Sequence, residues 1–123
     1  MNKKLPKNAF IFSDTIYCQD FVFVLTRSHE KFRRIMDKYL SIDIKPTEAD
    51  CSGEFYGLQH KNKGTLGVIW VSDKCSIVHE VFHATAWVML NRGVNLDIHA
   101  QGAEESWAYY IAYLYREIMA GLH

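Results

Sequence analysis

Hydrophobic residues change their spacing several times along this chain, and each change marks a predicted element of secondary structure. Residues 9–13 and 21–26 are rich in β-branched and aromatic side chains, which indicates two short strands. Apolar residues then recur at helical spacing over residues 29–40, and Ser28 stands where an N-cap is expected. The first third of the chain is therefore predicted to form two strands and a helix.

The rest of the chain is predicted to hold a hairpin followed by two helices. Residues 53–60 and 65–72 have the composition of strands, and residues 61–64 form the connection between them. Over residues 76–90 apolar side chains cover most of a helix circumference, which is typical of a buried helix. Residues 103–120 are again dense in apolar and aromatic side chains and predict a C-terminal helix.

The order of these elements predicts an α+β fold. We expect a small antiparallel or mixed β-sheet packed against the 76–90 helix, with the C-terminal helix lying antiparallel to it. With 123 residues the chain is expected to form a single domain, 1–123, around one core.

Composition narrows the classes of function. The formal net charge is +0, so electrostatics favour neither nucleic acid nor an anionic membrane as a partner. No apolar run has the length of a membrane span or follows the basic start as a secretion signal would. The chain has three widely spaced cysteines, Cys18, Cys51 and Cys75. An odd number at such spacing argues against a disulfide framework and is typical of proteins in a reducing cytoplasm. We expect a cytoplasmic protein, and the pattern predicts no oligomeric state.

One motif carries identifiable chemistry, the HExxH pattern formed by His79-Glu80-Val81-Phe82-His83. On a helix the two imidazoles lie on one face, where both can reach a single Zn²⁺ at about 2.0–2.1 Å. Glu80 is rotated by about 100° around the axis, a position suited to a general base acting on water rather than to a ligand. Both imidazoles are expected to project from a mostly buried helix. The alternative is a pair of core histidines, which leaves buried groups that each need a partner.

A catalytic zinc site needs a third protein ligand and an open position. Met89 occupies the place of the third histidine in the metzincin pattern and excludes that subclass. His99, between the helices, is one candidate. The pair Glu104-Glu105 is a better one, because antiparallel helices would bring the start of the second towards the middle of the first. Acidic residues there also complement the helix macrodipole, and periodicity does not choose between the two.

The motif followed by Glu105-Ser106-Trp107-Ala108-Tyr109 resembles the gluzincin zinc metallopeptidases, in particular minimal members that include short phage-encoded ones. The similarity extends over residues 79–114. It implies that Glu105 is the third zinc ligand and Glu104 a neighbour, and that a peptide or protein is the substrate. It also implies that the strand before the motif, residues 65–71, forms a sheet edge to which an extended peptide adds, and an ordinary core strand is the alternative that the sequence leaves open.

These observations predict a zinc-dependent metallopeptidase, with Glu80 as the base that accepts a proton from water and passes it to the leaving amine. An oxyanion donor is also expected, and Tyr109, Tyr110, Tyr113 and His60 are the candidates. A protein of a different class is the alternative. It is a catalytically weak or inactive zincin-fold protein that binds a partner through its aromatic surface.

Overall fold

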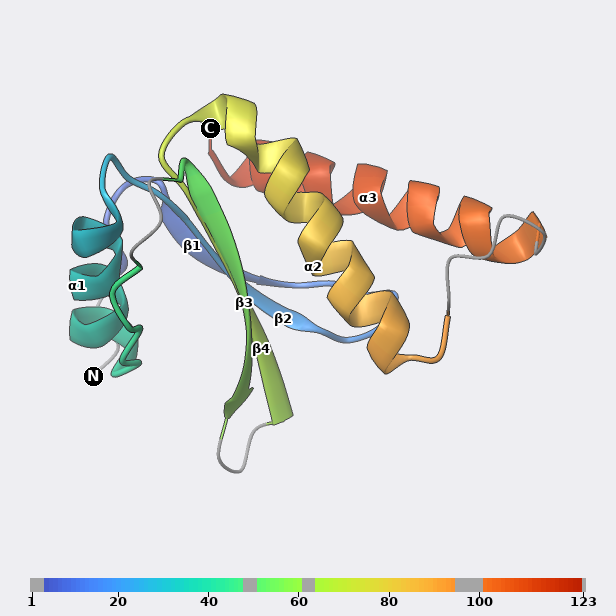
Figure 1. Cartoon of the computed structure of the whole chain (residues 1–123), viewed down its shortest axis with the longest axis horizontal. Coiled ribbons are helices and arrows are strands. Elements are labelled where there is room, and N and C mark those ends of the chain that lie inside the picture. Colours follow the sequence, from blue (N-terminus) through green and yellow to red (C-terminus); the bar gives the residue numbers. More distant parts are fainter. Residues whose placement is uncertain (1–3, 48–50, 61–63, 95–100, 123) are drawn as a thin grey trace.

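The chain folds into three layers, with one sheet between helices on both faces, as the computed structural model shows (Figure 1). Helix α1 covers one face of the sheet, and helices α2 and α3 cover the other. The elements are β1 (Ala9–Ser13), β2 (Asp20–Leu25), α1 (His29–Leu40), β3 (Gly53–His60), β4 (Gly64–Val71), the 3-10 turn η1 (Lys74–Ser76), α2 (Ile77–Asn91) and α3 (Gln101–Gly121). The structure describes residues 4–47, 51–60, 64–94 and 101–122.

The sheet is mixed, and its strands lie in the order β1-β2-β4-β3. Strands β2 and β4 are parallel, whereas β1 pairs with β2 and β3 pairs with β4 in antiparallel fashion. The predicted α+β fold with a mixed sheet is confirmed. Of the two alternatives for residues 65–71, the sheet edge is wrong and the core strand is confirmed, because β4 lies between β2 and β3. The edges are β1 and β3, and β3 is the edge strand that contacts α2.

Both faces of the central strands are buried, which explains their almost unbroken hydrophobic sequence. Along β2, Phe21 and Phe23 pack in the core under α2 and α3, whereas Val22 and Val24 pack in the core under α1. Strand β4 alternates in the same way, with Ile69 facing the α2 side. The sheet therefore separates two hydrophobic cores.

Helix α1 follows the predicted pattern closely. The Ser28 side chain accepts a hydrogen bond from the Lys31 backbone N–H at 3.1 Å, so the predicted N-cap is confirmed. Phe32 and Met36 are fully buried against the sheet. The helix ends at Ser41, whose left-handed φ of 56° terminates the backbone spiral.

Helix α3 packs across α2 and runs in roughly the opposite direction (Figure 1). Its inward face carries Trp107, Tyr110 and Leu114 at helical spacing, all of them buried. The Tyr110 hydroxyl donates a hydrogen bond of 2.5 Å to Asp14, a buried carboxylate in the turn after β1. Asp14 also accepts a hydrogen bond from the Ile16 backbone N–H, so it ties that turn to α3.

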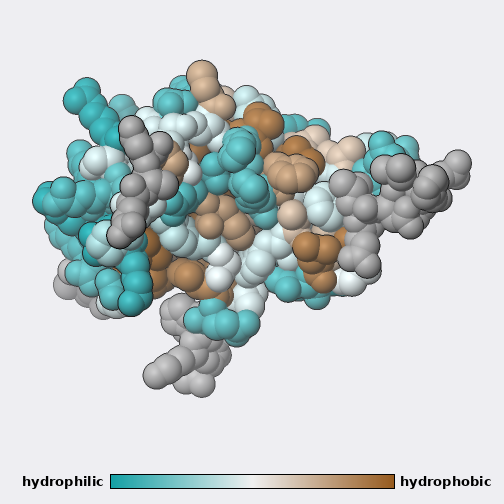
Figure 2. All heavy atoms as spheres, in the orientation of Figure 1, coloured by the Kyte–Doolittle hydropathy of each residue, from teal (hydrophilic) through white to brown (hydrophobic). Residues whose placement is uncertain are grey.

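The surface differs between the two ends of the molecule. Hydrophilic residues crowd the end that holds α1, whereas hydrophobic residues reach the surface over α2 and α3 (Figure 2). Among the helices that the structure describes, none is long and apolar enough to cross a membrane.

Candidate metal centre

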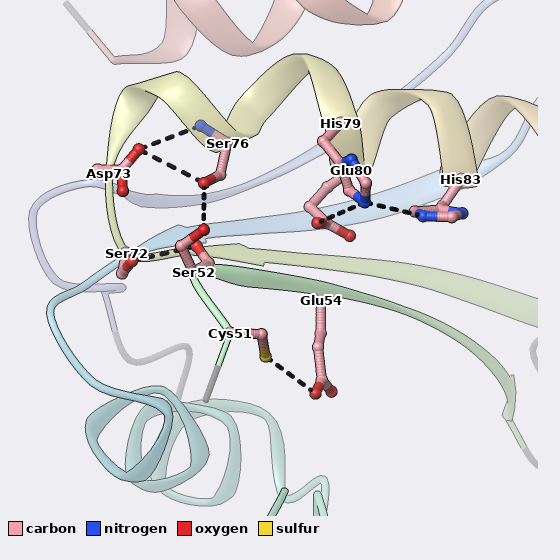
Figure 3. Close-up of polar contacts among 9 residues, drawn as sticks. All are labelled: Cys51, Ser52, Glu54, Ser72, Asp73, Ser76, His79, Glu80 and His83. Atoms are coloured by element: carbon pink, nitrogen blue, oxygen red, sulfur yellow. Dashed lines mark hydrogen bonds and ion pairs between the residues drawn. The ribbon is translucent and has the colours of Figure 1, made fainter. Parts of the chain in front are cut away.

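The start of α2 is anchored to the start of strand β3 by a group of short polar side chains (Figure 3). Asp73 caps η1 by accepting a hydrogen bond from the Ser76 backbone N–H at 3.1 Å. The Ser76 hydroxyl lies 2.8 Å from that of Ser52, and the Ser72 backbone N–H donates to the Ser52 carbonyl at 2.8 Å. These bonds fix the first turn of the motif helix relative to the edge strand.

The two motif histidines come together, as their spacing predicts. Their Nε2 atoms lie 3.1 Å apart and their ring centroids 4.8 Å apart. This distance is that of a hydrogen bond between the two rings. Figure 3 shows that both side chains project from α2 towards the sheet.

The expectation of a mostly buried motif helix is wrong for one side of α2. The His79 side chain is 71% exposed. Val78, Phe82 and Leu90 are also exposed although they are apolar. Apolar residues of α2 lie around most of its circumference. The sheet and α3 cover only part of that circumference, so the remaining apolar residues face solvent.

Glu80 lies under the helix, on the strand side. Its side chain is 6% exposed, and its ion-pair contact is with His79 Nε2 at 3.9 Å. Among the residues that the structure describes, no hydrogen-bond donor contacts this carboxylate. Burial raises the pKa of the Glu80 carboxyl, an effect that the charges of His79 and His83 only partly offset.

A glycine on the edge strand makes room for that carboxylate. A Cβ atom placed on Gly53 would lie 3.0 Å from Glu80 Cγ and 3.1 Å from its Oε2. Carbon atoms prefer separations of about 3.5–4.0 Å, so any side chain at this position would press on Glu80. Gly53 therefore helps to set where the carboxylate lies.

An open hollow of about 420 Å³ lies between β3 and α2 and brings the motif together with residues that sequence reasoning missed. Gly53, Phe55 and Trp87 were not predicted as site residues. For Trp87 a signal was available, because it follows His83 by one helical turn and so shares the face of the two histidines. The hollow is lined by Gly53, Glu54, Phe55, His79, Glu80, His83 and Trp87.

The two candidate glutamates on α3 lie apart from this hollow. Both Glu104 and Glu105 are exposed. Glu105 shares its helix face with Tyr109, which is 71% exposed, whereas Glu104 lies on the side of the buried Trp107. Within the described ranges, no group of three or more His, Cys, Asp or Glu side chains is placed to hold a metal ion. His99 lies outside the described residues.

The separation of the two histidine donors is compatible with a shared zinc ion. Tetrahedral bonds of about 2.0–2.1 Å place neighbouring ligand atoms about 3.3–3.4 Å apart, close to the 3.1 Å between the two Nε2 atoms. Imidazole nitrogen is also a preferred zinc donor. The donors of His79 and His83 therefore fit two of the three protein positions of a catalytic zinc site.

The candidate oxyanion donors lie elsewhere. Tyr110 donates to Asp14, and the Tyr113 hydroxyl accepts a hydrogen bond of 3.2 Å from the Thr15 backbone N–H. Neither of them lines the hollow, nor does the exposed Tyr109. The side chain of His60 lies outside the described part of the chain.

On the other face of the edge strand, Glu54 extends away from α2 (Figure 3). It accepts hydrogen bonds from Tyr56 and, at 3.3 Å, from the Cys51 thiol, and His29 Nε2 lies 2.6 Å from the Tyr56 hydroxyl. Burial acts to raise the pKa of Glu54, but hydrogen bonds from Tyr56, Thr47 and Cys51 outweigh it and hold the pKa below its ordinary value. Glu54 is thus fixed by its own network.

Comparison with models of known protein families, with curated protein sequences and with solved structures found no match to this chain. The chemistry of the hollow therefore has to be inferred from the side chains that line it.

Proposed function

We propose that this chain is a zinc-dependent metallopeptidase-like protein that hydrolyses a peptide bond. His79, His83 and Glu105 are the proposed metal ligands, and Glu80 is the proposed general base. The observation that supports this most is the buried Glu80 carboxylate, which accepts no hydrogen bond from any residue that the structure describes and lies beside two converging imidazoles. Burial of a carboxylate that accepts no hydrogen bond is costly for stability and is typical of functional sites.

The zinc ion, when bound, would lower the pKa of its water to about 7 and polarise the substrate carbonyl. Glu80 would accept the proton of that water and pass it to the leaving amine. Its raised pKa suits this role, because a base works best when its pKa approaches the working pH. Gly53 leaves room for this carboxylate beneath the helix.

The proposed substrate is a peptide in extended conformation. Strand β3 is at the sheet edge, and its residues 53–55 line the hollow. An edge strand offers backbone N–H and C=O groups that an extended peptide can pair with. Such pairing would present a peptide carbonyl to the side chains that hang from α2.

Glu105 remains the third ligand on the basis of the family resemblance alone. Its position on the exposed face of α3 makes it the part of the proposal most open to test. If Glu105 is the ligand, Glu105→Ala should weaken zinc binding by more than about tenfold, while Glu104→Ala leaves it near the wild-type value. The reverse ranking would transfer the role to Glu104.

The alternative function, an inactive zincin-fold protein that binds a partner, is favoured by a different observation. Val78, Phe82 and Leu90 expose apolar surface on α2, and exposed apolar patches are typical of binding surfaces. On this alternative, Glu80→Gln would keep a stoichiometric partner through washing. Zinc, if bound, would be structural.

The decisive experiment combines metal analysis with turnover. Purified protein should bind one equivalent of zinc and cleave peptides in a mixed library. Glu80→Gln should retain zinc and lose turnover, whereas His83→Ala should lose both. Glu117→Gln, an exposed carboxylate on α3, is the matched control and should retain both. Failure to bind zinc at equimolar concentration would refute the proposal.

A further inference from the structure

Two aromatic rings stand at one end of the hollow, beside the histidine pair. Trp87 follows His83 by one turn and His79 by two, so the three side chains form a row along α2. Phe55 reaches the same place from the edge strand, and its ring centroid lies 5.4 Å from that of Trp87, with the planes tilted by 57°. Both rings are only partly buried and line the hollow.

The indole of Trp87 packs against two glycines of neighbouring strands. A Cβ atom on Gly57 would come within 2.3 Å of Trp87 Nε1, and one on Gly67 within 3.2 Å of Cζ3. A side chain at Gly57 would therefore displace the ring, whereas one at Gly67 would overlap mainly with Phe21, at 2.6 Å, and only press on the indole. The sequence of two neighbouring strands thus fixes the place of this ring.

The Trp87 indole also differs from the other tryptophans in its hydrogen bonding. Trp70 donates its N–H to the Thr26 carbonyl at 3.1 Å, and Trp107 donates to the Val94 carbonyl at 3.2 Å. Across the described part of the chain, Trp87 Nε1 has no such partner. A ring that serves only to fill the core usually has its N–H satisfied.

We propose that Phe55 and Trp87 form a subsite that selects a large apolar side chain of the peptide substrate. This inference rests on the proposed function. One helical turn of about 5.4 Å separates His83 from Trp87, and an extended peptide rises about 3.3 Å per residue. The selected side chain therefore lies one or two residues from the cleaved bond.

The charges around the hollow support an apolar occupant and disfavour an acidic one. Glu80 lines the hollow and would repel a carboxylate on the peptide, whereas the Glu54 carboxylate points to the other face of the strand. An aromatic or large aliphatic side chain would instead bury its surface against two rings that are already in place. We expect the preference to run from Phe and Leu through Ala to Asp.

The test uses the zinc-loaded full chain and matched peptides that differ only at the selected position. Mass spectrometry of library cleavage products identifies that position. Wild-type kcat/KM should be at least about tenfold higher for Phe than for Ala. Trp87→Ala and Phe55→Ala should each reduce this ratio to about threefold or less. Equal rates for the two peptides in the wild type, or an unchanged ratio in both variants, would overturn the inference.

Further variants separate a subsite from loss of folding. Gly57→Ala keeps both rings but displaces the indole, so it should reduce the Phe-to-Ala ratio while the far-UV circular dichroism stays unchanged. Tyr115→Ala removes a partly exposed aromatic residue of α3 and should keep the wild-type ratio. A ratio that fell equally in Tyr115→Ala would show a general effect on folding and would contradict the subsite.

Binding distinguishes this inference from the proposed function. Peptide affinity is measured by the fluorescence anisotropy of a labelled peptide with Glu80→Gln, with and without Trp87→Ala, because this readout does not depend on Trp87 itself. If no peptide is cleaved by the wild type but Phe peptides bind in a manner that depends on Trp87, the proposed function fails and the subsite stands. If peptides are cleaved with no preference that depends on Trp87, the function stands and the subsite fails.

Discussion

The contact between Gly53 and Glu80 can be tested without any assumption about activity. Gly53→Ala would place a Cβ atom 3.0 Å from Glu80 Cγ and 3.0 Å from the Trp70 carbonyl oxygen. The φ of Gly53 lies outside the left-handed region, so alanine is not strained by the backbone itself. The cost therefore comes from the overlap of about 0.5–1.0 Å with the Glu80 side chain and from the closer carbonyl.

Overlap of this size in a packed site typically costs about 1–3 kcal/mol. The Trp70 carbonyl is backbone and is present in every variant, whereas Glu80→Ala removes both Cγ and the carboxylate. A double-mutant cycle over Gly53→Ala and Glu80→Ala therefore separates the contact with Glu80 from the contact with the Trp70 carbonyl. We expect Gly53→Ala to destabilise the wild type by about 2 kcal/mol and the Glu80→Ala protein by clearly less.

Urea denaturation followed by circular dichroism gives the four free energies of unfolding. With a slope of about 2 kcal/mol per M, a loss of about 2 kcal/mol lowers the midpoint by about 1 M, which is readily measured. An interaction energy below about 0.5 kcal/mol would mean that the two changes are additive. That result would refute the claim that Gly53 positions the carboxylate.

Three further predictions concern stability. The Thr85 hydroxyl is fully buried and has no hydrogen-bond partner among the described residues, so Thr85→Val should stabilise the protein by about 1 kcal/mol and raise Tm by about 3–6 °C in calorimetry. Glu54 has a lowered pKa, so its stabilising effect is present above its ordinary value of 4.5 and is lost as pH falls through the folded-state value. Glu54→Gln should therefore destabilise at pH 7, and urea unfolding across pH should show the difference from wild type vanishing in acid. A constant difference would contradict this. Tyr110→Phe removes the donor to buried Asp14 and should cost about 1.5–3 kcal/mol in urea denaturation, whereas the exposed control Tyr109→Phe should change stability by less than about 0.5 kcal/mol.

Local patterns predicted the elements of this fold better than their arrangement. The Ser28 cap and the helix it begins follow from side chains within one or two turns, so sequence alone suffices there. The order of the strands depends on contacts between distant segments. A signal for it was nevertheless available, because residues 68–71 form an unbroken apolar run of the kind that is buried on both faces, whereas residues 53–60 include glycine and polar side chains, as an edge strand does.

The residues of the candidate site also differ in whether local or long-range contacts determine their positions. His79 and His83 meet because helical geometry fixes their separation, and this required no knowledge of the tertiary structure. The positions of Glu104 and Glu105 depend on how α3 rotates about its axis when it packs. That rotation is set by the buried row that includes Trp107 and Leu114, which leaves Glu105 on the outer side. Gly53 makes room for the Glu80 side chain. The sequence does not show which side chain will pack over such a glycine.

Helix α2 departs from ordinary packing rules in a way that supports a functional role independently of its motif. Helix α1 buries Phe32 and Met36 and leaves its charged residues in solvent, as a helix shaped only by stability would. Helix α2 does the reverse at several positions, because it buries Glu80 and Thr85 and exposes Val78 and Phe82.

Burial of these polar side chains on α2 lowers the free energy of unfolding, and apolar residues in place of Glu80 and Thr85 would raise it. Violations of local rules that gather on one element are expected where function rather than stability determines the residues. We therefore infer that the face of α2 that carries Glu80 serves a function, and this inference does not depend on whether a metal binds there. A variant that combines Glu80→Leu with Thr85→Val should therefore be more stable than the wild type and lose whatever activity the hollow has.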